Sequence, residues 1–180
     1  MSHRDELLDL LVKKSLRRGD FTLSSGQKST YYIDGKLTTL DSRGAFLVAR
    51  VFLAMLADDV PDAVGGLTLG ADPIVGSLLA LAGLEDLELK GFIVRKQAKE
   101  HGTQSLVEGP IGKGDRVVVV EDVLTTGASS LKAVDAVREL GCVVDRVLVI
   151  VDREQGGREN LKKAGCRVEA IFSVSELLRV

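Results

Sequence analysis

The chain of 180 residues has little of what marks several large classes of protein. Its two cysteines, Cys142 and Cys166, have no C-x-x-C spacing and are too few for a disulfide scaffold. No segment approaches the roughly 20 apolar residues that a membrane span requires. The charged first 20 residues do not have the pattern of a signal peptide. A net charge of −2 argues against bulk electrostatic binding of nucleic acid or an anionic membrane, and leaves room for local basic patches. We therefore expect a cytoplasmic globular protein that binds neither nucleic acid nor a membrane.

Two common nucleotide-binding motifs are also missing. The chain contains no G-x-x-x-x-G-K-[ST], and its "GGLTLG" segment does not match G-x-G-x-x-G. A P-loop nucleotidase and a dinucleotide-dependent enzyme of the usual type are therefore not expected.

The apolar pattern predicts one α/β domain that covers residues 1–180. Leucines at helical spacing predict a helix over 4–18, and a second helix is expected over about 41–58. Strands then alternate with helices of 10–15 residues, which indicates a mainly parallel sheet that is flanked by helices on both faces. In such sheets ligands bind beyond the carboxyl ends of the strands. The expected strands cover residues 63–69, 89–96, 116–122, 143–153 and 166–174.

The stretch "VVVVEDVLTTGASS", residues 117–130, combines two carboxylates with small polar residues. Neighbouring strand residues point to opposite faces, so we expect the strand to end near Val120 and a turn to bring Glu121 and Asp122 to one crevice. Buried carboxylates need a partner, either a divalent cation or vicinal hydroxyl groups. The hydroxyls and backbone N–H groups that follow suit a phosphate at a helix N-terminus. The alternative is an acidic turn before a well-capped helix.

This stretch resembles the phosphoribosyl-pyrophosphate (PRPP) motif of the type I phosphoribosyltransferases. The resemblance implies that Glu121 and Asp122 bind the ribose 2- and 3-hydroxyls and that the following loop wraps the 5-phosphate. It also implies that family's fold, with a small N-terminal hood (about residues 1–40 plus the C-terminal segment) and a mobile catalytic loop. The implied PRPP-binding residues in this stretch are Glu121, Asp122, Val123, Leu124, Thr125, Thr126, Gly127, Ala128 and Ser129.

The segment "VRKQAKEHGTQSLVEG", residues 94–109, is similar to the R-K-x-x-K-x-H-G catalytic loop of orotate phosphoribosyltransferases. Arg95, Lys96, Lys99 and His101 gather positive charge that suits a pyrophosphate. The alternative is a solvated basic loop. The resemblance implies that all four residues bind PRPP and that Lys99 and His101 are catalytic. In that family the loop reaches across a homodimer, so the active sites would be shared.

Two further segments match the same family. "VDREQGG", residues 151–157, contains Arg153, which the resemblance pairs with the carboxylate of orotate, while Thr125 would face the pyrimidine edge. "FTLSSGQKSTYYID", residues 21–34, is similar to the start of the base-binding hood. There Tyr32 or Tyr31 would supply an aromatic face to the base, with core packing as the alternative for both.

The chain departs from the family at two places. Ser24 stands where many members have a substrate-binding lysine, and Lys28 is the candidate to replace it. Asp72 lies in the segment that would form the pyrophosphate loop, and its charge does not suit a contact with pyrophosphate.

The resemblance implies transfer of the phosphoribosyl group of PRPP to orotate, which gives orotidine 5-monophosphate and pyrophosphate in de novo pyrimidine (UMP) biosynthesis. The implied cofactor is Mg²⁺, held mainly by PRPP and water and not by direct protein ligands. Two alternatives are weighed: a purine phosphoribosyltransferase, which would lack the basic loop and Arg153, and a non-catalytic PRPP-sensing regulator, which would lack Lys99 and His101.

Overall fold

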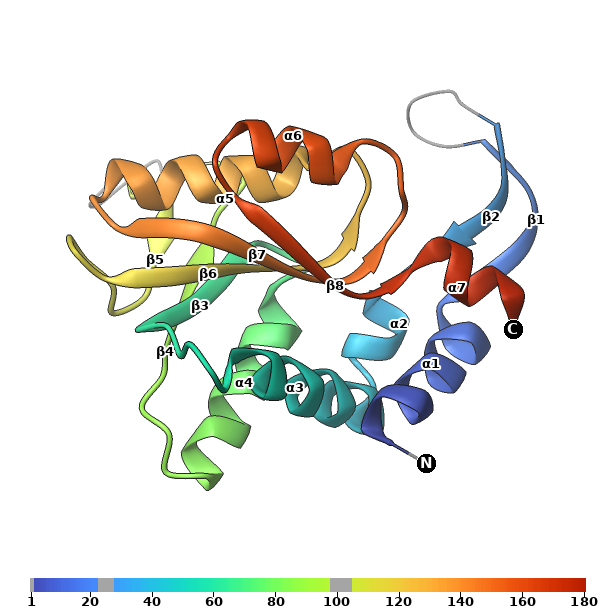
Figure 1. Cartoon of the computed structure of the whole chain (residues 1–180), viewed down its shortest axis with the longest axis horizontal. Coiled ribbons are helices and arrows are strands. Elements are labelled where there is room, and N and C mark those ends of the chain that lie inside the picture. The colour runs from blue at the N-terminus through green and yellow to red at the C-terminus, as the bar shows by residue number, and fades with distance from the viewer. Residues whose placement is uncertain (1, 23–27, 98–104) are drawn as a thin grey trace.

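The computed structural model describes residues 2–22, 28–97 and 105–180. Its centre is a six-stranded sheet with the order β5-β4-β3-β6-β7-β8 (Figure 1). Every neighbouring pair is parallel except β4 and β5. The expected α/β class with a mainly parallel sheet is confirmed. The strands are β3 (Ala63–Leu67), β4 (Lys90–Val94), β5 (Val107–Glu108), β6 (Arg116–Leu124), β7 (Val143–Asp152) and β8 (Arg167–Ser173).

Helices cover both faces of this sheet. In Figure 1, α3 (Ser42–Leu56) and α4 (Asp72–Leu84) lie below the sheet, and α5 (Ala128–Glu139) and α6 (Gly157–Lys163) lie above it. The inner strands are rich in valine, whose branched side chain packs well on a sheet that is buried on both sides. Two buried apolar clusters result, one on each face of the sheet.

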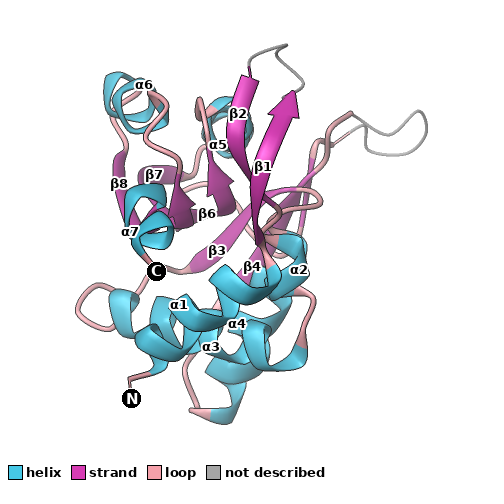
Figure 2. Cartoon of the chain, turned by 90° about the vertical axis from the view of Figure 1, so that its right-hand side faces the viewer, coloured by secondary structure: helices cyan, strands magenta, loops and turns pink. Residues whose placement is uncertain are grey.

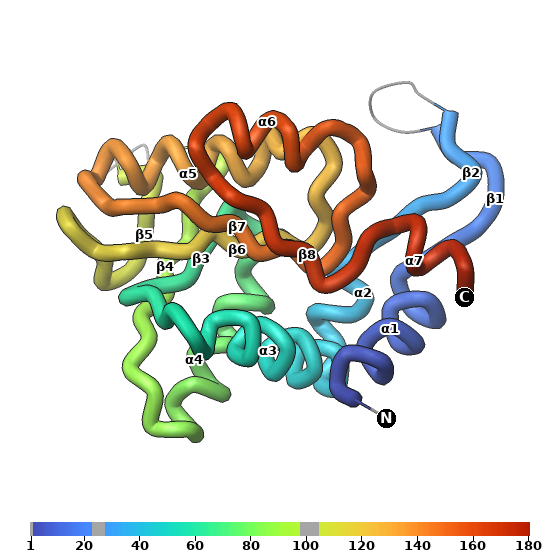
Figure 3. The backbone as a smooth tube through the Cα atoms, viewed as in Figure 1, coloured from blue at the N-terminus to red at the C-terminus, as the bar shows by residue number. Residues whose placement is uncertain are grey.

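The N-terminal part of the chain forms a separate hairpin and two helices. Helix α1 (His3–Lys14) begins at a capping box of Ser2 and Asp5. Strands β1 (Leu16–Thr22) and β2 (Lys28–Ile33) then pair antiparallel, and α2 (Lys36–Thr39) follows (Figure 2). The last helix, α7 (Val174–Arg179), lies beside α1, so the first and last helices of the chain pack together (Figure 3).

The expected helix over 4–18 is wrong beyond Lys14. Leu16 is buried and pairs with Ile33 as the first residue of β1. The preceding Ser15 is fully buried, and its hydroxyl is 2.7 Å from that of Thr38. Tertiary contacts with the hairpin partner therefore override the helical spacing of the leucines.

Strand β6 also differs from the expectation. It continues to Leu124, beyond the end that was expected near Val120. Pairing with β3 ends at Val119, but pairing with β7 continues to Leu124 and Asp152. The last residues of β6 are therefore held on one side only, and their other side is open to the loop that follows β3.

No helix in the described ranges is long and apolar enough to cross a membrane.

Candidate active site

Glu121 and Asp122 are both buried, with 7% and 8% of their surface exposed. Although they are neighbours within a strand, both reach the loop that follows β3. A Cβ atom placed on Gly70 would lie 2.6 Å from Asp122 Oδ1 and 3.0 Å from Glu121 Oε1. The two carboxylates therefore converge without the early strand end that we expected. Gly35, at the start of α2, is as close, since its Cβ would lie 2.8 Å from Asp122 Cβ. A side chain at either position would therefore displace Asp122.

The two carboxylates have different neighbours. Burial, and then the charge of Asp122, raise the pKa of Glu121 to about 8. Ser130 Oγ donates a hydrogen bond to Glu121 Oε2 at 3.1 Å. Asp122 Oδ2 instead faces Lys36 Nζ at 4.0 Å, and Lys36 also forms an ion pair with Asp34 at 2.7 Å. The hydrogen bond from Lys36 to Asp34 raises the pKa of the lysine, so its ammonium stays charged beside the acidic pair.

The loop from β6 to α5 forms a small cradle. Gly127, the residue before α5, has a left-handed backbone with φ of 84°. The backbone N–H groups of the first helical turn have no partner within the helix and carry the positive end of its dipole. Asn160 Nδ2 holds the loop by donating to the carbonyl of Thr126 at 2.9 Å. A cavity of about 80 Å³ is lined by Glu121, Val123, Leu124, Thr125, Thr126, Gly127, Ala128 and Ser129.

Arg153 lies beside this loop, directly after β7. Its backbone N–H donates to the carbonyl of Leu124 at 2.9 Å, so it is next to Thr125 across the ends of the two strands. The side chain is buried, with 8% of its surface exposed. Within the described ranges, its Nε and Nη2 atoms have no hydrogen-bond partner. Its guanidinium carbon lies 5.1 Å from the centre of the Tyr31 ring.

The basic loop is anchored at both of its described ends. The backbone N–H of Arg95 donates to the carbonyl of Leu106 at 2.8 Å, and Lys132 donates to the carbonyl of Lys96. Arg95 is half-buried, with its side chain 3.5 Å from Glu108, and Lys96 is exposed. The predicted catalytic residues Lys99 and His101 lie outside the described residues, as does Ser24.

The remaining predicted residues lie on the hairpin and after β3. Tyr32 is 41% exposed, and its ring lies against Phe21 with centres 5.8 Å apart. Lys28 is exposed at the start of β2. Asp72, which begins α4, accepts a hydrogen bond at Oδ2 from Thr68 Oγ1 at 2.7 Å. This contact turns one oxygen of Asp72 toward its own loop.

Sequence reasoning missed three residues of this region: Lys36, Ser130 and Asn160. Ser130 was detectable, since it follows the motif by one residue in the first turn of the expected helix. Lys36 and Asn160 come from elements far from the motif in sequence, and no local pattern marks them. In the described ranges, no three or more His, Cys, Asp or Glu side chains are grouped to hold a metal ion.

Comparisons with known proteins agree with this geometry. Residues 40–174 match the family model of the phosphoribosyl transferase domain. The orotate phosphoribosyltransferase of Thermosynechococcus vestitus is 51% identical over 97% of this chain and 92% of its own length. That of Nostoc sp. is 49% identical over 97% and 84%. The crystal structure of Mycobacterium tuberculosis orotate phosphoribosyltransferase with PRPP superposes with a TM-score of 0.82 at 37% identity, over 98% of this chain and 99% of that one.

An acidic pair near the carboxyl end of a parallel strand, followed by a glycine-led helix N-terminus, is typical of a phosphoribosyltransferase site, and the chain belongs to the phosphoribosyltransferase family. An adenine phosphoribosyltransferase from Thermoanaerobacter pseudethanolicus, at 15% identity and a TM-score of 0.64, shares only the fold. Within the family, this chain belongs with the orotate phosphoribosyltransferases.

Proposed function

We propose that the chain catalyses transfer of the phosphoribosyl group from PRPP to orotate, which gives orotidine 5-monophosphate and pyrophosphate in pyrimidine biosynthesis. N1 of orotate would form the new bond to ribose C1 and release its proton to water or to the departing pyrophosphate, while the bond from C1 to the pyrophosphate oxygen breaks. The observation that carries the choice of base is Arg153. Its buried guanidinium has nitrogen atoms without a partner among the described residues, beside the end of β6. A forked cation suits a carboxylate, which orotate has and the purine bases lack.

The geometry of the β6 loop supports the assignment of PRPP. Glu121 and Asp122 would accept hydrogen bonds from the ribose 2- and 3-hydroxyls at the open side of β6. The backbone N–H and hydroxyl groups of residues 125–129 would donate hydrogen bonds to the 5-phosphate. Because the acidic pair touches Gly35 and Gly70, the ribose would lie where three segments meet. This arrangement would hold C1 while orotate approaches from the side of Arg153.

Divalent magnesium fits this site through the acidic pair. Among the described residues, the ammonium of Lys36 is the one cation that forms an ion pair with this acidic pair, so the site favours an additional cation. Mg²⁺ prefers oxygen ligands and keeps several waters, so PRPP and water would supply its ligands while the two carboxylates compensate its charge. We propose that Glu121 and Asp122 face a metal ion that PRPP brings with it. That ion would neutralise charge on the departing pyrophosphate.

The basic loop would complete the site when it closes. Arg95 and Lys96 lie at its anchored end, and Lys99 and His101 are proposed to donate to the leaving pyrophosphate. We further propose that the loop serves the site of a second copy in a homodimer. Three exposed leucines, Leu37, Leu40 and Leu69, adjoin the segments that touch the acidic pair and suit such a contact. The two free, buried thiols accord with the reducing cytoplasm as its location.

A direct assay tests the activity. Purified protein with PRPP and Mg²⁺ should consume orotate, measured by the loss of its absorbance, and should release pyrophosphate. Adenine, hypoxanthine and uracil serve as the matched alternatives, and none should be consumed at a comparable rate. Turnover of a purine base without turnover of orotate would overturn the assignment.

A mixing experiment tests the shared sites. Lys99→Ala and Asp122→Asn each should be inactive alone, because each lacks one part of every site. If the loop serves the partner, mixed dimers contain one intact site, and random exchange of subunits should restore about a quarter of wild-type activity. Mixtures that stay inactive after exchange, shown by mass photometry of tagged subunits, would place the loop in its own subunit's site.

A further inference from the structure

A buried arginine that must bind a ligand has a structural problem. Its charge needs stabilisation inside the protein, but a carboxylate partner would occupy the N–H groups that the ligand requires. Arg146, elsewhere in the same sheet, shows the usual solution. Its Nη2 donates to Glu169 Oε2 at 2.8 Å and to the carbonyl of Met55 at 2.6 Å. Arg153 has no such partner at Nε or Nη2 among the described residues.

The backbone of Arg153 is fixed from both sides. Its own N–H donates to Leu124, and the carboxylate of the preceding Asp152 accepts from Arg158 Nε at 3.1 Å and from the backbone N–H of Glu154 at 2.8 Å. Glu154 itself has a left-handed backbone, with φ of 58°. These contacts determine where the side chain of Arg153 starts, but they do not determine where its guanidinium points.

Tyr31 supplies the missing contact. It lies on β2 of the hairpin, is half-buried, and packs against the apolar cluster beside α1 and α3. Its ring centre is 5.1 Å from the guanidinium carbon of Arg153. An aromatic face attracts a cation by its quadrupole without a carboxylate that would occupy the N–H groups, so those groups remain available to a ligand. This is the kind of support that an arginine with a ligand still to bind requires.

We propose that Tyr31 is a positioning residue for the base, and that it acts through Arg153 by orienting the guanidinium toward the carboxylate of orotate. The proposal rests on the proposed function, in which Arg153 binds orotate. It also gives the hairpin a defined role in substrate choice, because a residue of β2 holds a residue that follows β7. The neighbouring Tyr32 has no such role, since its ring faces Phe21.

The test compares Tyr31→Met, which keeps an apolar side chain without the aromatic face, with Tyr31→Phe, which keeps the face. In steady-state assays of the full-length protein, Tyr31→Met should raise the KM for orotate about tenfold, while kcat and the KM for PRPP change less than twofold. Tyr31→Phe should stay within twofold of wild type in all three constants. If Tyr31→Met does not fold, Tyr31→Leu takes its place. Phe46→Met is the matched control, because it removes a similar contact outside this site: the guanidinium carbon of Arg43 lies 5.0 Å from the centre of the Phe46 ring. It should leave the KM for orotate unchanged.

A second comparison separates action through Arg153 from direct contact with the base. In the Arg153→Met background, replacing Tyr31 by Met should have no further effect on orotate affinity, measured by calorimetry with PRPP absent and orotate at millimolar concentration. A further tenfold loss would mean that the ring touches orotate itself and would overturn the proposal. So would an unchanged KM in Tyr31→Met, or an equal loss in Tyr31→Phe. If wild-type protein turns over orotate, these outcomes leave the proposed function intact. If it does not turn over orotate, the proposed function and this inference both fail.

Discussion

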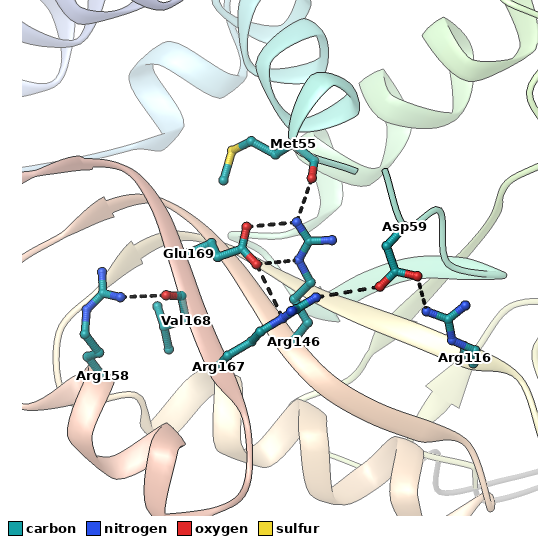
Figure 4. A network of polar contacts seen from close by, with 8 residues as sticks. All are labelled: Met55, Asp59, Arg116, Arg146, Arg158, Arg167, Val168 and Glu169. Atoms are coloured by element: carbon teal, nitrogen blue, oxygen red, sulfur yellow. Dashed lines mark hydrogen bonds and ion pairs between the residues drawn. The ribbon is translucent and has the colours of Figure 1, made fainter. Parts of the chain in front are cut away.

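The two ends of the parallel strands differ in how their charged side chains are paired. Near the amino ends of β6, β7 and β8, arginines and carboxylates are paired with each other (Figure 4). Arg146 contacts Glu169 and the carbonyl of Met55, while Arg116 and Arg167 contact Asp59. Near the carboxyl ends, Glu121 and Asp122 stand side by side, and two nitrogens of Arg153 have no partner among the described residues.

The pKa values show the same contrast. At the amino ends, the hydrogen bond from Arg116 lowers the pKa of Asp59. At the carboxyl ends, burial and the charge of Asp122 raise the pKa of Glu121 to about 8. Paired charges stabilise the fold, whereas charge that the protein leaves unsatisfied is available to a ligand. We therefore expect substitutions at the two ends to separate stability from activity.

The largest effect is expected at Arg153. Arg153→Met should lower kcat/KM for orotate about a hundredfold, since a charge-assisted hydrogen bond to a carboxylate is lost. The KM for PRPP and the melting temperature should change little, because the side chain makes no hydrogen bond at Nε or Nη2 within the described chain. Steady-state kinetics and thermal unfolding measure both. A large loss of stability with normal orotate kinetics would assign Arg153 to the fold.

Arg146→Met is the reverse case. It removes one of the two arginines that pair with Glu169 and leaves the Met55 carbonyl without its donor, so the free energy of unfolding should fall by about 2 kcal/mol in urea denaturation. Both KM values should stay within twofold of wild type at a temperature where the variant is folded. Impaired orotate binding with unchanged stability would show that the two ends of the strands do not differ as we argue.

Sequence reasoning predicted the parallel sheet and the chemistry of β6 well, because valine runs and the acidic pair followed by "TTGAS" are local signals. It placed the end of β6 too early. Alternation of side chains along a strand was taken to prevent Glu121 and Asp122 from converging, but the Cβ-free Gly70 lets both carboxylates reach one loop. The helix over 4–18 was too long because the pairing of Leu16 with Ile33 is a long-range contact.

The roles of single residues were harder to predict where they depend on contacts between segments that are far apart in the sequence. Lys36 reaches the acidic pair because α2 begins at Gly35, which packs against Asp122. Tyr31 and Tyr32 are adjacent in sequence, and only the pleat of β2 decides which ring meets Arg153. A local pattern cannot distinguish them, since both tyrosines fit the same motif.

Titration of Glu121 should make stability depend on pH. Its folded pKa, about 8, is above its ordinary value of 4.5. The contribution of its neutral form to stability is therefore fully present below pH 4.5 and is lost as the pH rises through 8. Glu121→Gln cannot titrate, so the ligand-free variant should melt higher than wild type by about 5 °C at pH 8, and the gap should close toward pH 4.5. Melting curves between pH 4 and 9 measure this gap.

Asp59→Asn supplies the control of opposite sign. The pKa of Asp59 is lowered from 3.8, so its ionised form stabilises the fold above that pH, and this contribution is lost as the pH falls through the folded value. The variant should melt lower than wild type at neutral pH and approach it in acid. If both variants gave pH-independent gaps, the contrast between the two ends would not be electrostatic.

The smallest effect is expected at Lys36. Its side chain is 41% exposed, so its attraction to Asp122 at 4.0 Å is partly screened by solvent. Lys36→Met should change the dissociation constant for PRPP with Mg²⁺ about fivefold, because the ammonium and the incoming cation compensate the same carboxylates. Lys36→Arg keeps the charge and should remain near wild type. Lys90→Met is the matched control, because it removes an ion pair of similar exposure, with Asp115 at 3.0 Å, far from the acidic pair in the sheet.

The sign of the change in Lys36→Met is informative: weaker binding of PRPP means that Lys36 assists PRPP directly, and tighter binding means that it competes with the metal ion for Asp122. An affinity equal to that of Lys90→Met would show that Lys36 has no part in the electrostatics of the site.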